Sequence, residues 1–178
     1  MKMFVRIALI SLTALVAGNL AAFAQARGDK KARPSPNASI SQTIGTTVVS
    51  VNYGRPGLKG RSVESLVPEN KVWRTGANES SAITFSGDVM VGDASISAGT
   101  YSIYSIPEGG KFTVIINSKL SWGTQYDESQ DVARISLPLQ DGSGYEWFTI
   151  DFDTLSNEGA HMNLRWANYW VAVPITVK

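Results

Sequence analysis

The chain contains no cysteine and a single histidine. The lack of cysteine excludes disulfides, thiol catalysis and thiolate metal sites, so the packing of side chains alone has to hold the fold. A Ser-His-Asp triad would have to use His161, the one histidine. His161 lies within an alternation of polar and apolar residues that is typical of a β-strand, and we therefore interpret it as a surface residue of a sheet.

The sequence also lacks an excess of charge of either sign, with 16 Lys and Arg residues against 15 Asp and Glu residues. Non-specific binding of nucleic acid needs a basic surface that displaces the counterions of the phosphates, so this balance argues against nucleic acid as a partner. The G-x-S-x-G, H-E-x-x-H, Walker and Rossmann motifs are all missing. We therefore expect no cofactor and no catalytic residues of these classes.

No apolar run is long enough to span a membrane as a helix. The longest, Ile7–Leu20, falls short of the roughly 20 apolar residues that such a helix needs. It follows Lys2 and Arg6 and precedes an A-F-A sequence ending at Ala24, which is typical of a signal-peptide cleavage site. We predict a signal peptide over residues 1–24 and a periplasmic or secreted mature protein without a transmembrane segment. A membrane anchor is the alternative.

Residues 25–37 combine basic residues with two prolines and few apolar side chains, which predicts a flexible linker. Residues 38–178 are long enough for one domain with its own core. Here polar and apolar residues alternate with a period of two, in about nine or ten short segments. This pattern predicts an all-β fold, a single antiparallel β-sandwich or jelly-roll-like barrel. One helical turn is expected after Ser62, which can cap it.

Single residues indicate where strands turn and where they form an edge. Gly45 separates two short strands, and Gly92 with Asp93 supplies the backbone of a tight hairpin. Residues 141–144, with the sequence DGSG, are expected to form another turn. Pro138 and Pro174 each lie within a strand-like segment, and because proline lacks an N–H we expect both on edge strands.

The first of two stretches without alternation runs from Gly54 to Ser80. Its polar side chains could form a pocket for an anionic or polyhydroxylated ligand, since arginine offers a planar set of donors to carboxylate or phosphate. The alternative is structural: Arg74 and Glu79 pair with each other or with Asp131, and Trp73 plugs the core. The candidate ligand-binding residues of this stretch are Arg55, Arg61, Arg74, Asn78 and Glu79.

The second such stretch runs from Ser118 to Asp131 and adds Trp122, Tyr126 and Asp131 to the candidates. Aromatic rings beside carboxylates are typical of sugar sites, in which a ring stacks on C–H groups and oxygens bind hydroxyls. The acidic residues match no EF-hand spacing, so we expect no metal site. Long irregular connections in a compact domain are usually functional or disordered, and the Trp and Arg content favours function.

Five segments of the sequence resemble the DUF2911 family, in the same order: VNYGRPGLKGR, LVPENKVWRTGANES, AGTYSIYSIP, FTVIINSKLSWGTQYD and DVARISL. The resemblance extends from about Ser35 to the C-terminus. It implies an exported, β-rich bacterial envelope protein of unknown function, so no catalytic residue can be transferred from it. Most of the resemblance falls in the two irregular stretches, which we therefore treat as one feature.

The leading hypothesis is a binding module for a small anionic, polar or glycan ligand, in which both irregular stretches meet at one end of the sandwich. The arginines would hold the ligand, Asn78 and Glu79 would orient it, and Trp122 and Tyr126 would stack on it. Two alternatives remain. One is a hydrolase using Glu79 with Asp127 or Asp131, and the other is a structural envelope protein with an internal polar network. The oligomeric state is open.

Overall fold

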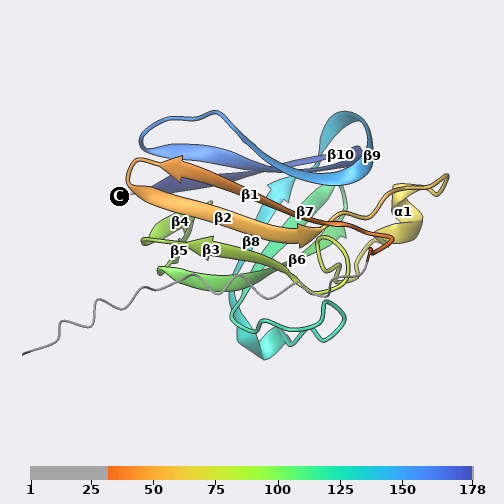
Figure 1. Ribbon diagram of the computed structural model, residues 1–178, viewed down its shortest axis with the longest axis horizontal. Helices are drawn as coiled ribbons and strands as arrows, with labels where there is room; N and C mark the ends of the chain where they lie inside the picture. Colours follow the sequence, from red (N-terminus) through yellow and green to blue (C-terminus); the bar gives the residue numbers. More distant parts are fainter. Residues whose placement is uncertain (1–31, 178) are drawn as a thin grey trace, which may run out of the picture.

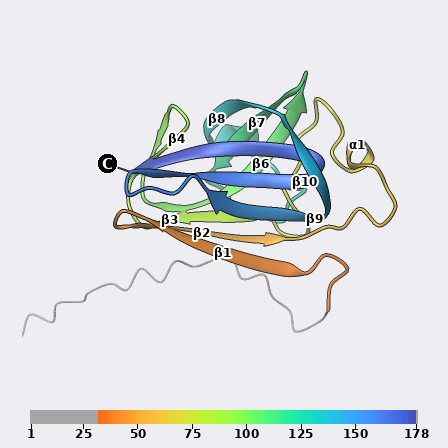
Figure 2. The same cartoon turned by 90° about the horizontal axis from the view of Figure 1, so that it is seen from above.

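The computed structural model describes residues 32–177. The expected signal peptide and residues 25–31 of the expected linker lie outside the described residues. Within this part of the chain no helix is long and apolar enough to cross a membrane. The described residues fold into two antiparallel sheets that lie face to face as two layers (Figures 1 and 2).

The larger sheet has six strands and the smaller one has four. In spatial order the larger sheet consists of β1 (Asn37–Ile44), β2 (Thr47–Gly54), β3 (Ser81–Phe85), β6 (Gly99–Glu108), β7 (Lys111–Asn117) and β8 (Asp131–Pro138). The smaller sheet consists of β5 (Ala94–Ile96), β4 (Val89–Val91), β10 (Gly159–Val177) and β9 (Gln140–Asp153). The predicted all-β sandwich of nine or ten strands is confirmed, and over residues 32–177 it does not close into a barrel.

Alternate residues of the strands fill the space between the two sheets, as a period of two requires. In β10 this places one set of apolar side chains in the core, as the sequence predicts. The buried members of that set are Ala160, Met162, Leu164 and Trp166. They pack against apolar residues of the larger sheet, such as Val49 and Val51 of β2, in a single core cluster.

Asn163 departs from this pattern. The alternation places it on the outer face beside His161, but its exposed fraction is 0%. Its amide nitrogen donates to Asp151 Oδ1 at 2.8 Å, and its carbonyl oxygen accepts a hydrogen bond from the indole of Trp170 at 2.8 Å. Neighbouring side chains on the outer face therefore cover it, whereas His161 stays partly exposed, as expected.

The expected turns after β1 and β4 are confirmed. Gly45 and Gly92 have φ angles of 56° and 58°, values that glycine adopts without steric cost. The helical turn is confirmed as α1 (Val63–Leu66), where the Ser62 hydroxyl accepts a hydrogen bond from Ser65 N. Figure 1 shows α1 at one end of the sandwich.

Two expectations about turns and edges are wrong. The DGSG sequence, residues 141–144, lies inside β9, where it accommodates one of the two register shifts against β10 rather than a turn. Pro174 lies in β10, an internal strand, one residue before the pairing with β4 and beyond the last pair with β9. Its missing N–H therefore falls between two ladders. Pro138, in contrast, ends the edge strand β8, as predicted.

Candidate functional site

The two irregular stretches form the connections between β2 and β3 and between β7 and β8, and they contact each other. The second one contains the short 3-10 helix η1 (Glu128–Gln130). Ser80 N donates to Ser121 O at 3.0 Å, and Gly123 N donates to Asn78 O at 3.1 Å. These backbone bonds hold the end of the first connection beside the start of the second.

An open hollow of about 480 Å³ lies between the two connections. Its lining consists of Leu66, Val72, Trp73 and Arg74 from the first connection and Gly123, Thr124 and Tyr126 from the second. Only Arg74 and Tyr126 of the predicted site residues take part. Among residues 32–177 the lining therefore combines polar and apolar surface and supplies one cation and no carboxylate.

Trp73 and Arg74 reach this place because the first connection continues beside β6. Trp73 N donates to Ser105 O at 2.7 Å, and Ser105 N donates to Trp73 O at 2.9 Å. The Trp73 ring packs on Phe148 and stacks on Trp166, with ring centroids 5.0 and 5.6 Å apart. The interpretation of Trp73 as a core plug is thus confirmed, and its backbone fixes the position of Arg74.

The Arg74 side chain lies across Gly123. A Cβ atom at position 123 would approach Arg74 Cβ to 2.9 Å and Asn78 O to 2.8 Å, so only glycine leaves room for the arginine stem. Within residues 32–177 no hydrogen bond or ion pair engages the guanidinium of Arg74. The expected pairing of Arg74 with Glu79 or Asp131 is therefore wrong.

Glu79 and Asn78 bind the chain segment that precedes β1 instead of lining the hollow. Both carboxylate oxygens of Glu79 accept hydrogen bonds from Arg33 Nη1, at 3.0 and 2.8 Å. The amide of Asn78 donates to Ser35 O at 3.1 Å. The end of the expected linker is thus bonded to the domain, and Arg55 N adds a bond of 2.8 Å to Pro36 O.

Arg55 and Arg61 satisfy backbone groups rather than facing the hollow. Arg55 donates from Nε to Phe148 O at 3.0 Å, and from Nη2 to the Thr149 hydroxyl at 2.7 Å, along the open edge of β9. Arg61 donates to two carbonyls of its own connection, Leu58 O and Gly57 O, each at 3.0 Å. Such bonds protect a sheet edge and a loop, so both arginines have structural roles.

Asp131 and Tyr126 belong to a polar network that holds the second connection on β7 and β8. The Tyr126 hydroxyl donates to Asp131 Oδ2 at 2.6 Å and accepts from Arg134 Nη2 at 2.8 Å. Asp131 Oδ1 accepts a hydrogen bond of 2.7 Å from Asn117. Burial, with the Asp131 carboxylate, raises the pKa of Tyr126 to about 12. The hydroxyl is therefore engaged, and the ring, packed against Tyr104, remains on the wall of the hollow.

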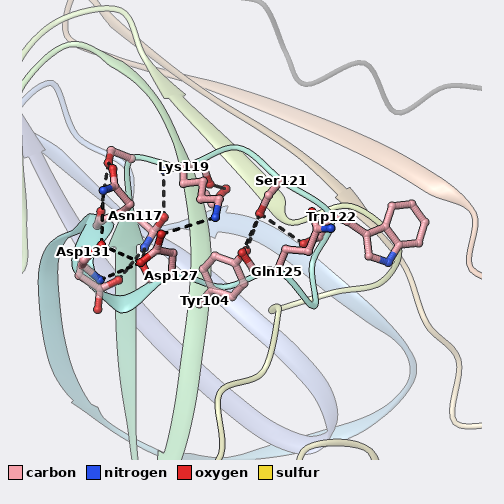
Figure 3. A network of polar contacts seen from close by, with 12 residues as sticks. Tyr104, Asn117, Lys119, Ser121, Trp122, Gln125, Asp127 and Asp131 are labelled. Atoms are coloured by element: carbon pink, nitrogen blue, oxygen red, sulfur yellow. Dashed lines mark hydrogen bonds and ion pairs between the residues drawn. The ribbon is translucent and has the colours of Figure 1, made fainter.

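Trp122 is 47% exposed and does not line the hollow. Figure 3 shows its ring pointing away from the polar contacts around Asn117, Asp127 and Asp131. The stacking wall that the sequence predicts from Trp122 and Tyr126 is thus divided. Only the Tyr126 half lies beside Arg74.

The carboxylates considered for acid–base chemistry already have partners. Glu79 is paired with Arg33, and Asp131 with Arg134 and Tyr126. The hydroxyl of Ser129 is the main cause that lowers the pKa of Asp127, and Lys119 adds to it at 3.5 Å. Among the described residues no group of three or more acidic or histidine side chains is arranged to hold a metal ion.

The sequence did not single out Leu66, Val72, Gly123 or Thr124 as site residues. None of them carries a charge or lies in a motif that indicates a ligand, and they meet only because the two connections pair. The one available signal was Gly123, which directly follows the exposed Trp122 within an irregular stretch.

The chain belongs to the DUF2911 family of proteins of unknown function, whose family model matches residues 35–175. No curated protein and no solved structure was found to match it. The matched range includes both connections and every residue that lines the hollow. Family membership assigns no activity, so the function has to be argued from the geometry of the site.

Proposed function

We propose that this domain binds a small anionic ligand in the hollow and that Arg74 holds the anionic group. The observation that carries the proposal is the guanidinium of Arg74, which lines a hollow without carboxylates and has no partner among residues 32–177. A guanidinium presents its donors in a planar fork that matches carboxylate and phosphate. An anion would supply the hydrogen bonds that the fold leaves unmade.

The position of Arg74 supports a binding role over a solvated surface charge. The side chain is half-buried, and its stem packs against the backbone of Gly123. Trp73, next in the chain, is fixed in the core. An arginine held in this way loses less conformational entropy on binding than a freely moving side chain.

We also propose that the domain acts outside the cytoplasm of a bacterium, in the periplasm or beyond. Support comes from the basic start at Lys2 and Arg6, the apolar run Ile7–Leu20 and the small-residue site ending at Ala24. N-terminal sequencing of the protein from a native envelope fraction tests this. A chain that begins at Gln25 is expected, and an uncleaved N-terminus would contradict it.

The binding proposal is tested by titrating acetate, citrate and inorganic phosphate into the wild type and Arg74→Gln. We expect at least one of these anions to bind, and Arg74→Gln to weaken it about 10- to 100-fold, the loss typical of a charged hydrogen bond. Arg61→Gln is the matched control, because Arg61 lies on the same connection but bonds only loop carbonyls. Equal affinities for Arg74→Gln and the wild type, or no binding of any anion, would contradict the proposal.

A further inference from the structure

We infer that the ligand is an amphipathic anion, whose charged group binds Arg74 while an apolar group covers the walls of the hollow. This inference rests on the proposed function and narrows its ligand to one chemical class. It comes from the rest of the lining, which a compact inorganic anion would leave uncovered.

The size of the hollow argues for more than a single small ion. Its volume of about 480 Å³ falls within the range of roughly 300 to 1,000 Å³ that is usual for organic ligands of drug size. A phosphate or acetate bound at Arg74 would fill a small part of it. The remainder has to be filled by water or by another part of the ligand.

The apolar part of the lining favours an apolar group over water. It comes from Leu66, Val72 and the rings of Trp73 and Tyr126, beside a larger polar part, and Val72 is 40% exposed. The hydroxyl of Tyr126 is engaged by Asp131 and Arg134, so this residue offers its ring rather than a donor. Covering such surface releases about 25 cal/mol per Å², and an apolar group gains this free energy whereas a polar one does not.

Trp73 sets the inner limit of this apolar wall. It also lines a second, apolar cavity of about 10 Å³ inside the sandwich, together with core residues such as Val67, Phe148 and Leu164. That cavity is barely large enough for one water molecule and offers it no polar partners. With Trp73 in place the apolar group of the ligand therefore stays in the hollow, and Trp73 determines how long this group can be.

Titration with a series of straight-chain carboxylates (acetate, butanoate, hexanoate and octanoate) tests the inference, with benzoate beside it to separate chain from ring. We expect the affinity to rise by up to about fourfold for each buried CH₂, until the chain outgrows the hollow. If neither octanoate nor benzoate binds more tightly than acetate, the inference is wrong. If Arg74→Gln still weakens the binding of every carboxylate in that case, the proposed anion site stands although the inference about an apolar group fails.

Two variants locate the apolar group. Val72→Asn should weaken octanoate several-fold more than it weakens acetate, and Val48→Asn is the control, because Val48 is 37% exposed on β2 and does not line the hollow. Trp73→Ala should join the two cavities and shift the optimum toward longer chains. Since Trp73→Ala removes core packing and can fail to fold, Val72→Asn decides alone: an equal effect on acetate and octanoate overturns the inference.

Discussion

Arg165 and Arg74 both lie beside aromatic side chains, one on the outer face of the four-stranded sheet and the other at the hollow. Arg165 donates to Asp151 at 3.0 Å and to Asp153 at 3.2 Å. Its guanidinium also lies 4.6 Å from the ring centre of Trp170. Arg74, beside Trp73, has neither a carboxylate nor a hydrogen-bond acceptor within the described chain.

This contrast separates residues that stabilise the fold from residues that are available to a ligand. Both arginines lie beside aromatic side chains, a combination that is common in binding sites, so the types of the neighbouring residues do not distinguish them. The difference is whether the fold itself supplies the partners. On the outer face strand β9 brings two carboxylates to Arg165 of β10, whereas the connections that form the hollow bring none to Arg74.

Glu79→Ala is the strongest test of the residues whose partners are supplied by the fold. The side chains of Glu79 and Arg33 are only 11% and 16% exposed, so the change leaves a largely buried cation without its carboxylate. We expect a loss of about 3 kcal/mol in the free energy of unfolding, measured by chemical denaturation. Glu158→Ala is the control, since the Glu158 side chain is exposed and bonds to no described residue. Similar losses in both variants would contradict the structural role of the pair.

A direct comparison of the two arginines is the next test. Arg165→Ala should lower the free energy of unfolding by about 2 kcal/mol, because it removes two charged hydrogen bonds and the contact with Trp170. Arg74→Ala should change it by less than about 0.5 kcal/mol, since no bond is lost. If Arg74→Ala destabilises the protein as much as Arg165→Ala does, Arg74 is a structural residue and the contrast fails.

The sandwich could be predicted from the sequence because the signals for strands and turns depend on residues that are close together in the chain. Alternation in β10, the glycines at positions 45 and 92 and the cap at Ser62 each depend on a few neighbouring residues, and each was confirmed. The failures inside strands, such as residues 141–144, arose where tertiary pairing overrode a local turn signal.

The composition of the site could not be predicted in the same way, because partners come from distant segments. Glu79 is paired with Arg33, 46 residues away, and Arg55 bonds to the carbonyl of Phe148, 93 residues away. No local pattern tells which arginine finds such a partner. Only the folded chain therefore shows that Arg74 is the exception among the predicted arginines.

Gly123→Ala sharpens the contrast by disturbing Arg74 without removing it. The new methyl group would crowd the Arg74 stem and Asn78 O, at a cost of about 1 kcal/mol or more in the free energy of unfolding. Truncation of the stem in Arg74→Ala should relieve part of this, so the double variant should be less destabilised than the sum of the single ones. Denaturation of all four proteins measures the coupling. Strict additivity would show that the arginine does not lie across Gly123.

The smallest effect concerns Tyr126, which belongs to the paired network and to the wall of the hollow at once. Its pKa is raised from 10.0 to about 12 by burial and by Asp131, so the folded state holds the phenolic proton more tightly than the unfolded state does. The resulting stability is fully present below pH 10 and is lost as the pH rises towards about 12. The difference in unfolding free energy between the wild type and Tyr126→Phe should therefore shrink across this window.

Tyr53 and Tyr169, whose pKa values burial also raises, occur in both proteins and cancel in that difference. A difference that stays constant through the window would mean that the Tyr126 hydroxyl is not held by Asp131, and that its side of the hollow is less fixed than the hydrogen bond indicates.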